Sequence, residues 1–223
     1  MTLKSDYVSS RSIRTKSGVK LNCSAIIYES FVNAAAKDAD GISESHLGAA
    51  VAGTTDMPLD GLSVSGGAAL IGGSPLIAPR NVVITVTHAT SVVAMSGLIY
   101  GYRDGKLLTE AWSVTATGTS KTFTGLKTFD YVTQITEVIV ADASTNTIIA
   151  GNGDKLGLRA SCAVASLVKE MANGSVVTNG VVVRADTAAT ADPRGTYAPN
   201  TIPDGAVDYE IWYISNQPEA TVT

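Results

Sequence analysis

The side chains in this sequence that could carry catalysis are few and widely separated. Only two histidines are present, so a nucleophilic triad would have to use His46 or His88 as its base. His46 lies in Ser-Glu-Ser-His-Leu, which lacks the HExxH spacing of a zinc-binding helix. His88 closes an alternating stretch, where a structural role is favoured. Cys23 and Cys162 belong to neither a CxxC motif nor a Cys/His cluster, which is typical of reduced thiols in a cytoplasmic product.

Other motifs match chemical sites only in part. The run that starts at Asp38 opens like a calcium loop, but positions 6 and 12 of that loop would hold Ser43 and Ala49 instead of Gly and Glu. Glu110 and Glu137 could form the carboxylate pair of a glycosidase, because such pairs need no fixed sequence spacing. Exposed strand positions explain these two residues equally well. We therefore expect no catalytic residue, no metal site and no cofactor.

Charge is distributed unevenly along the chain. The 223 residues carry a net charge of −4, which gives no general case for nucleic-acid binding. The first 20 residues nevertheless hold five basic residues against one acidic residue. A basic segment ahead of an acidic body favours an arm that binds an acidic partner surface, although a solvated terminus would have the same composition. The candidate contacts of this arm are Arg11, Arg14, Lys16 and Lys20.

No membrane partner is expected. The first residues lack the apolar core of a secretory leader, and the most apolar stretch, 61–78, is broken by glycine pairs and a proline. Residues 29–40 predict a short helix, because Ala34–Ala36 are strong helix formers and Gly41 could cap it. Residues 41–80 are rich in small side chains and predict an extended connector. The chain is thus expected to divide into an arm with connector, 1–80, and a body, 81–223.

The body is expected to be all-β, a β-sandwich of the jelly-roll type. Alternating and β-branched runs recur from residue 81 onward, with turn signals every 8–15 residues. The Asp104-Gly105 and Asn173-Gly174 pairs and the run 151–153 predict tight turns. Residues 160–171 fit either a short helix or a strand. The side chains expected in the core are Trp112, Val114, Ile135, Val138, Val140, Ile211 and Tyr213.

The serial order of motifs from residue 81 resembles a group of small virion proteins of tailed bacteriophages. The motifs, which together cover about 81–216, are NVVITVT at 81–87, GYRDG at 101–105, ExWxVTxTGT at 110–119, GLKTF at 125–129, GxGDKLGL at 151–158 and DxRGTYxPN with PDG between 192 and 205. The resemblance implies a capsid decoration (cement) protein, made in the host cytoplasm and bound to the capsid exterior of the virion. It does not extend to the first 80 residues.

This resemblance implies two partners. One is the major capsid protein, and the other is the protein itself, as a homotrimer that matches three-fold positions of an icosahedral shell. Arg194 and Tyr197, in a loop with Gly195 and Pro199, are candidate subunit-interface residues, although the tyrosine could instead fill the edge of the core. An alternative function is a receptor- or glycan-binding protein of the phage tail or fibre. The aromatic content of 6% is low for a glycan-binding platform.

Overall fold

The regular secondary structure is entirely β-strand over the residues that the computed structural model describes, 25–72 and 78–215. This confirms the predicted all-β class. The strands are β1 (Ala25–Phe31), β2 (Asp38–Leu47), β3 (Gly53–Asp56), β4 (Val64–Ser65), β5 (Ala68–Leu70), β6 (Arg80–Thr87), β7 (Met95–Arg103), β8 (Lys106–Val114), β9 (Ser120–Phe129), β10 (Tyr131–Ile139), β11 (Thr147–Gly157), β12 (Cys162–Ala172), β13 (Ser175–Val176), β14 (Val181–Arg184), β15 (Gly195–Ala198) and β16 (Tyr209–Ser215).

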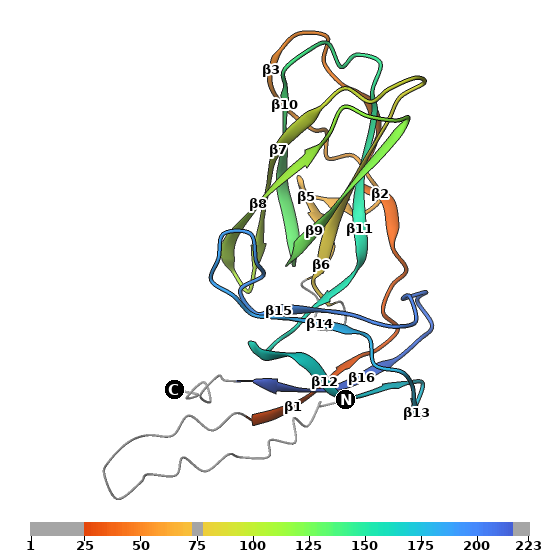
Figure 1. The fold of residues 1–223 in the computed structure, drawn as a ribbon, viewed down its shortest axis with the longest axis vertical. Helices are drawn as coiled ribbons and strands as arrows, with labels where there is room; N and C mark the ends of the chain where they lie inside the picture. The colour runs from red at the N-terminus through yellow and green to blue at the C-terminus, as the bar shows by residue number, and fades with distance from the viewer. Residues whose placement is uncertain (1–24, 73–77, 216–223) are drawn as a thin grey trace, which may run out of the picture.

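Three antiparallel sheets make up this part of the chain. One has the order β4-β5-β10-β7-β8, with β3 also paired to β10, and the second has the order β14-β15-β11-β6-β9, with β2 also paired to β11. The third is a four-stranded sheet, β1-β16-β12-β13. We call this third sheet the end sheet, because it lies across the lower end of the elongated molecule in Figure 1, beneath β14 and β15.

The first core lies between the two larger sheets. Strand β6 contributes Val82, Ile84 and Val86, which alternate with outward residues as the sequence predicts, and β8 contributes Trp112 and Val114. From β10, Ile135 is buried as expected. The other core predictions for β10 are wrong: Val138 is only half-buried, and Val140 follows the strand with 70% of its surface exposed. Side chains alternate along a strand, so the burial of Ile135, Glu137 and Ile139 turns Val138 outward.

The second core lies between the end sheet and the strands above it. It is rich in aromatic rings, and includes Phe31, Tyr197, Tyr209 and Tyr213 among its buried members. Phe31 stacks on Tyr197 with a centroid distance of 5.7 Å, and Tyr209 meets Tyr197 edge-on at 6.3 Å. Burial of Ile211 and Tyr213 confirms the prediction for the last strand. Residues 160–171, for which helix and strand were both open, belong largely to strand β12.

Two of the three predicted turns are present. Asp104 and Gly105, and likewise Asn173 and Gly174, have positive φ angles between 48° and 74°, as a two-residue hairpin turn requires. The predicted turn at 151–153 is wrong, because these residues lie inside β11. A Cβ atom at Gly151 would lie 1.8 Å from the carbonyl oxygen of Asp38, so glycine there permits close approach of β2 instead of a chain reversal.

The predicted helix and connector before residue 80 are both wrong over the described residues. Residues 29–31 belong to β1, which pairs with β16, and residues 38–40 belong to β2, so Ala34–Ala36 lie in the link between two strands. Strand β2 pairs with β11, while β3 and β5 pair with β10. Residues 41–80 therefore supply strands to the two larger sheets, and a boundary at residue 80 would cut through both of them. The chain before Ala25 lies outside the described residues.

Candidate functional site

The outer surface of the end sheet is a continuous face of aromatic, aliphatic and charged side chains. Because neighbouring residues of a strand point to opposite faces, the burial of Ile211 and Tyr213 turns Trp212 outward. In the sheet register Tyr28 lies opposite Trp212 on one side, and Lys169 lies opposite it on the other. We call this surface the end face, and its members are Ile26, Tyr28, Lys169, Glu210, Trp212 and Ile214.

The two rings of the end face contact each other and a lysine. The centroids of Tyr28 and Trp212 are 5.0 Å apart, with the ring planes tilted by 48°. The ammonium nitrogen of Lys169 lies 5.0 Å from the centre of the Trp212 ring, within the range of a cation–π contact. Partial burial and the nearby charge of Glu210 raise the pKa of Tyr28, so the phenol stays neutral over the physiological range.

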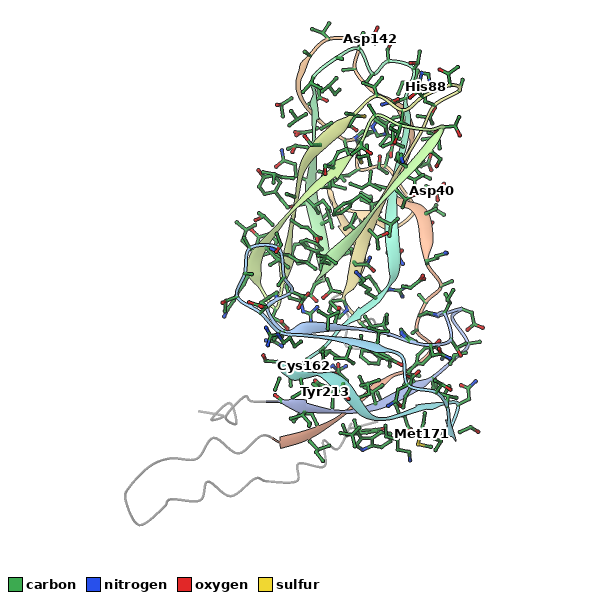
Figure 2. The ribbon with its side chains drawn as sticks, in the orientation of Figure 1. Asp40, His88, Asp142, Cys162, Met171 and Tyr213 are labelled. Carbon is green, nitrogen blue, oxygen red and sulfur yellow. The ribbon has the colours of Figure 1, made fainter. Side chains whose placement is uncertain are left out.

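The end face remains partly open to solvent in the described molecule. Tyr28 is 40% exposed and Ile26 is 52% exposed, whereas Trp212 and Ile214 are half-buried by their strand neighbours. Figure 2 shows side chains projecting below the end sheet, on the side away from Tyr213. Exposed apolar surface of this kind, interleaved with charges, is typical of a surface that binds another protein.

The predicted interface residues lie elsewhere. Tyr197 is completely buried in the second core, so its assignment to a subunit interface is wrong. The reason is that its ring packs between Phe31 and Tyr209. Burial and the neighbouring Glu170 raise the pKa of its phenol. Arg194 is one-third exposed, but its guanidinium forms an ion pair with Asp104 at 3.2 Å and donates to the carbonyl oxygen of Arg159. Arg11, Arg14, Lys16 and Lys20 lie outside the described residues.

Glu110 and Glu137 are buried, which corrects the expectation that they are exposed strand residues. Glu137 on β10 accepts a 2.6 Å contact from Nε2 of His46 on β2, and so joins the two larger sheets. Burial alone would lower the pKa of His46, but the hydrogen bond and the charge of Glu137 outweigh it and raise the pKa. Glu110 instead accepts hydrogen bonds from the backbone N–H groups of Leu126 and Lys127.

His88 has a structural environment. Its Nδ1 accepts hydrogen bonds from the backbone N–H groups of Thr90 and Ser91, each at 2.9 Å, so the ring closes the turn after β6. Its Nε2 contacts the hydroxyl of Thr145 at 2.7 Å. These partners come from its own turn and from Thr145 in the loop before β11, so the ring joins two loops of the fold.

The charged side chains at the junction between the two cores form hydrogen bonds with other groups of the same chain. Asp192 accepts from the backbone and hydroxyl of Thr128, both at 2.8 Å, and from the N–H groups of Arg194 and Gly195 at 2.9 Å. Buried Arg103 donates to the carbonyl oxygen of Leu158 and to the Thr128 hydroxyl. Buried charges need partners of this kind, and here the partners fix the strands around the junction.

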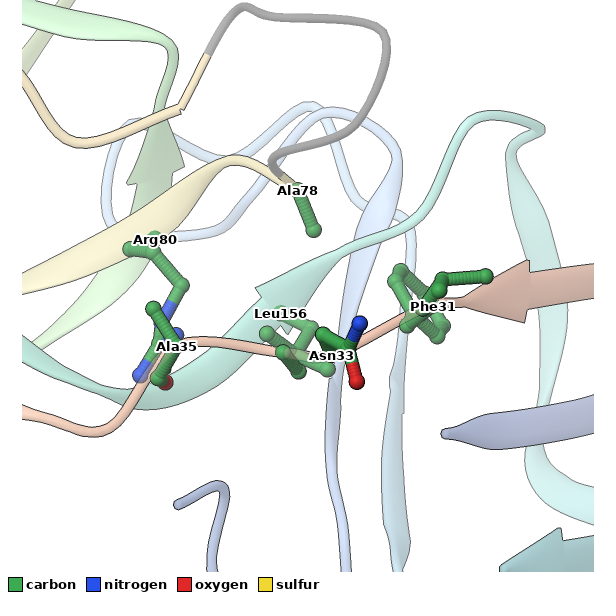
Figure 3. Close-up of a pocket in the computed structure, with 8 residues that line it drawn as sticks. Phe31, Asn33, Ala35, Ala78, Arg80 and Leu156 are labelled. Atoms are coloured by element: carbon green, nitrogen blue, oxygen red, sulfur yellow. The ribbon is translucent and has the colours of Figure 1, made fainter. Parts of the chain in front are cut away.

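The pocket drawn in Figure 3 is small. Phe31, Ala35, Arg80 and Leu156 surround it, and its volume of about 50 Å³ is far below the several hundred Å³ of a typical small-molecule site. The guanidinium of Arg80 donates hydrogen bonds to the carbonyl oxygens of Gly153 and Ala35. Within the described ranges no three His, Cys, Asp or Glu side chains gather as metal ligands, and no helix is suited to crossing a membrane.

Comparison with known proteins adds no relative: no family model, no curated protein and no solved structure matches this chain. Neither Tyr28 nor the outward position of Trp212 was predicted from the sequence. The strand alternation that placed Ile211 and Tyr213 in the core also required Trp212 to point outward, so that signal was present in the sequence.

Proposed function

We propose that the protein is a non-enzymatic virion component of a tailed phage, a decoration (cement) protein that binds the outside of the head shell through its end face. The observation that carries this proposal is the partly exposed aromatic face at one end of an elongated β body. In the described part of that body, the buried charged side chains contact other groups of the same fold. A protein that works by covering a partner needs a surface of this kind and no deep pocket.

The occupant of the end face is the major capsid protein, at an acidic part of its outer surface. The basic residues Arg14, Lys16 and Lys20 precede Ala25, where the end sheet starts, by 5 to 11 positions in the sequence. We therefore propose that these basic residues bind the same part of the shell as Tyr28 and Trp212. Opposite charge on the shell would steer docking, and apolar contact at the end face would hold it.

Two competing functions fit the described site less well. A glycan platform needs open, nearly coplanar ring faces, but Lys169 lies over one face of Trp212 and Tyr28 is tilted by 48° to it. A hydrolase would need an accessible nucleophile. The hydroxyl of Ser43 lies 3.5 Å from Nδ1 of His46, but Ser43 is completely buried and cannot meet a substrate.

We also propose that the two larger sheets form a sandwich of the jelly-roll type, and that the protein acts as a homotrimer. The strand order supports the first point: β6, β9 and β11 are neighbours in one sheet, β10, β7 and β8 in the other, and the chain passes back and forth between them. The trimer rests on the symmetry of the shell, where three subunits meet at each three-fold position. Sedimentation of the purified protein measures the trimer, and a monomer would remove that part of the proposal.

Antibody labelling of intact particles, imaged by electron microscopy, tests the proposed role. Label spread over the head lattice supports a decoration protein, whereas label at the tail tip or fibres would replace it with the receptor-binding alternative. Deletion of residues 1–20 tests the arm separately. The shortened protein should fold and bind shells more weakly than the full chain, with the largest difference at low salt, where charges are least screened. Equal binding at low salt would exclude the arm.

A further inference from the structure

A lysine, an asparagine and a glutamate meet inside the body, away from the end face. Asn81 on β6 is completely buried, and its amide nitrogen donates to the carbonyl oxygen of Gly125 at 3.3 Å. The ammonium nitrogen of Lys155 on β11 donates to the same carbonyl oxygen at 2.8 Å. The backbone N–H of Lys155 also donates to Oδ1 of Asn81 at 2.9 Å, so the backbone of β11 is fixed against this amide.

Glu110 on β8 approaches the same glycine. Its Oε1 accepts from the N–H groups of Leu126 and Lys127, whereas its Oε2 is buried without a hydrogen-bond partner among the described residues. A Cβ atom at Gly125 would lie 2.8 Å from that Oε2 and 2.8 Å from the carbonyl oxygen of Val82, so a larger residue there would displace the carboxyl group or the strand. An unpartnered buried carboxyl oxygen is costly, and a catalytic role is one reason why a protein keeps such a group.

The protonation states favour reaction between the amine and the amide. Burial lowers the pKa of Lys155, partly offset by the charge of Glu110, which makes the neutral, nucleophilic amine more accessible. Burial raises the pKa of Glu110, opposed by its two backbone hydrogen bonds and by the charges of Lys127 and Lys155. The second nearby amine, on Lys127, is instead bound to the carbonyl oxygen of Thr109 at 2.6 Å.

We propose that Lys155 and Asn81 join in an intramolecular isopeptide bond, with Glu110 as the group that carries the proton. Nζ of Lys155 attacks Cγ of Asn81, and a new C–N bond forms. Glu110 passes a proton to the tetrahedral intermediate and receives one from the attacking nitrogen. The bond from Cγ to Nδ2 then breaks, and ammonia leaves. The reaction is an amide exchange, so it needs no oxidant, reductant or co-reactant.

The bond would join β6 to β11, which are neighbours in the sheet that closes the first core. It would enclose every strand from β6 to β11 within one covalent loop, and so restrict the unfolded chain as a disulfide does. Mechanical and thermal resistance of this kind suits a protein exposed on the outside of a particle, although the chemistry does not depend on that role.

Intact-mass spectrometry of the full chain under denaturing conditions tests the proposal directly. The expected mass is that of the sequence less one ammonia, and digestion should release a branched peptide that joins Asn81 to Lys155. A succinimide at any of the three Asn-Gly pairs, at Asn152, Asn173 or Asn179, would also lose one ammonia, so the branched peptide is required. A folded protein with the full sequence mass, or an ammonia loss mapped only to one of these three asparagines, overturns the proposal.

Matched variants separate the chemistry from folding. Lys155→Arg and Glu110→Gln should keep the β-sheet circular dichroism spectrum and retain the full sequence mass. Lys127→Arg, at the neighbouring buried amine, should still lose ammonia at Asn81. If Glu110→Gln forms the bond as completely as the parent protein, Glu110 is removed from the reaction. Loss of the bond in Lys127→Arg with an intact fold would contradict the assignment of Lys155 as the only nucleophile.

Discussion

The two cores are both buried between β-strands, but they are built from different side chains. The first core is mainly aliphatic and surrounds Trp112, whose indole N–H donates to the carbonyl oxygen of Thr136 at 2.9 Å. The second core is built around tyrosines, and it buries the carboxyl groups of Glu29 and Glu170 beside them. The first core should therefore respond mainly to lost volume, and the second to lost hydrogen bonds.

Removal of volume from the first core should have the largest effect. Trp112→Ala is expected to lower the free energy of unfolding by about 3–5 kcal/mol, because it leaves a cavity among fully buried neighbours. Chemical denaturation measures this change. Trp212→Ala is the matched control on the end face and should cost far less, since that ring is only half-buried. Equal losses in the two variants would contradict the assignment of inward and outward faces.

Loss of one tyrosine hydroxyl from the second core should have the next largest effect on the free energy of unfolding. Tyr213→Phe removes the donor to Glu29, at 2.9 Å, and leaves that buried carboxyl with fewer partners. The expected cost is about 1–3 kcal/mol in denaturant titrations. Tyr209→Phe is the control, because its hydroxyl donates to the neutral carbonyl oxygen of Thr201. A smaller loss for Tyr213→Phe than for this control would mean that Glu29 does not depend on the hydroxyl.

The ion pair between the larger sheets should give a smaller effect that depends on pH. The histidine of this pair, His46, has a raised pKa in the folded state. The stabilisation that the ion pair adds to the free energy of unfolding is therefore fully present below about pH 6.5, and it is lost as pH rises through the raised pKa. Glu137→Gln should therefore lower the free energy of unfolding by about 1 kcal/mol in mildly acid solution. The difference from the parent protein should narrow on the alkaline side. A constant difference across this range would show that the pair is not charged.

The smallest effect on stability is expected on the end face. Lys169→Ala removes the contact with Trp212 and should cost less than about 1 kcal/mol, because the site is partly solvated. Thermal unfolding and tryptophan fluorescence measure this change together. A loss as large as that of Trp112→Ala would show that the end sheet depends on its outer face for folding.

Features set by neighbouring residues could be predicted from the sequence. The hairpin at Asp104-Gly105 needs two positive φ angles, and the alternation in 81–87 needs one buried face, so both are local. Features set by distant partners could not. Glu137 is buried because it meets His46, 91 positions away, and Tyr197 is buried by rings from two other strands. The side chains of strand β3 are exposed along its whole length, so they show no alternation of buried and exposed positions. This strand is defined by its backbone pairing with β10, which its own sequence does not indicate.

The most direct test of the proposed function measures binding of the purified protein to empty head shells by cosedimentation. The double variant Tyr28→Ser/Trp212→Ser should fold like the parent protein and lose at least about tenfold in affinity, since aromatic anchors dominate protein interfaces. Leu107→Ser/Val140→Ser is the matched control, because both side chains are more than 60% exposed and lie outside the end sheet. This control should bind as the parent does. Unchanged binding by a folded Tyr28→Ser/Trp212→Ser variant would contradict the central claim.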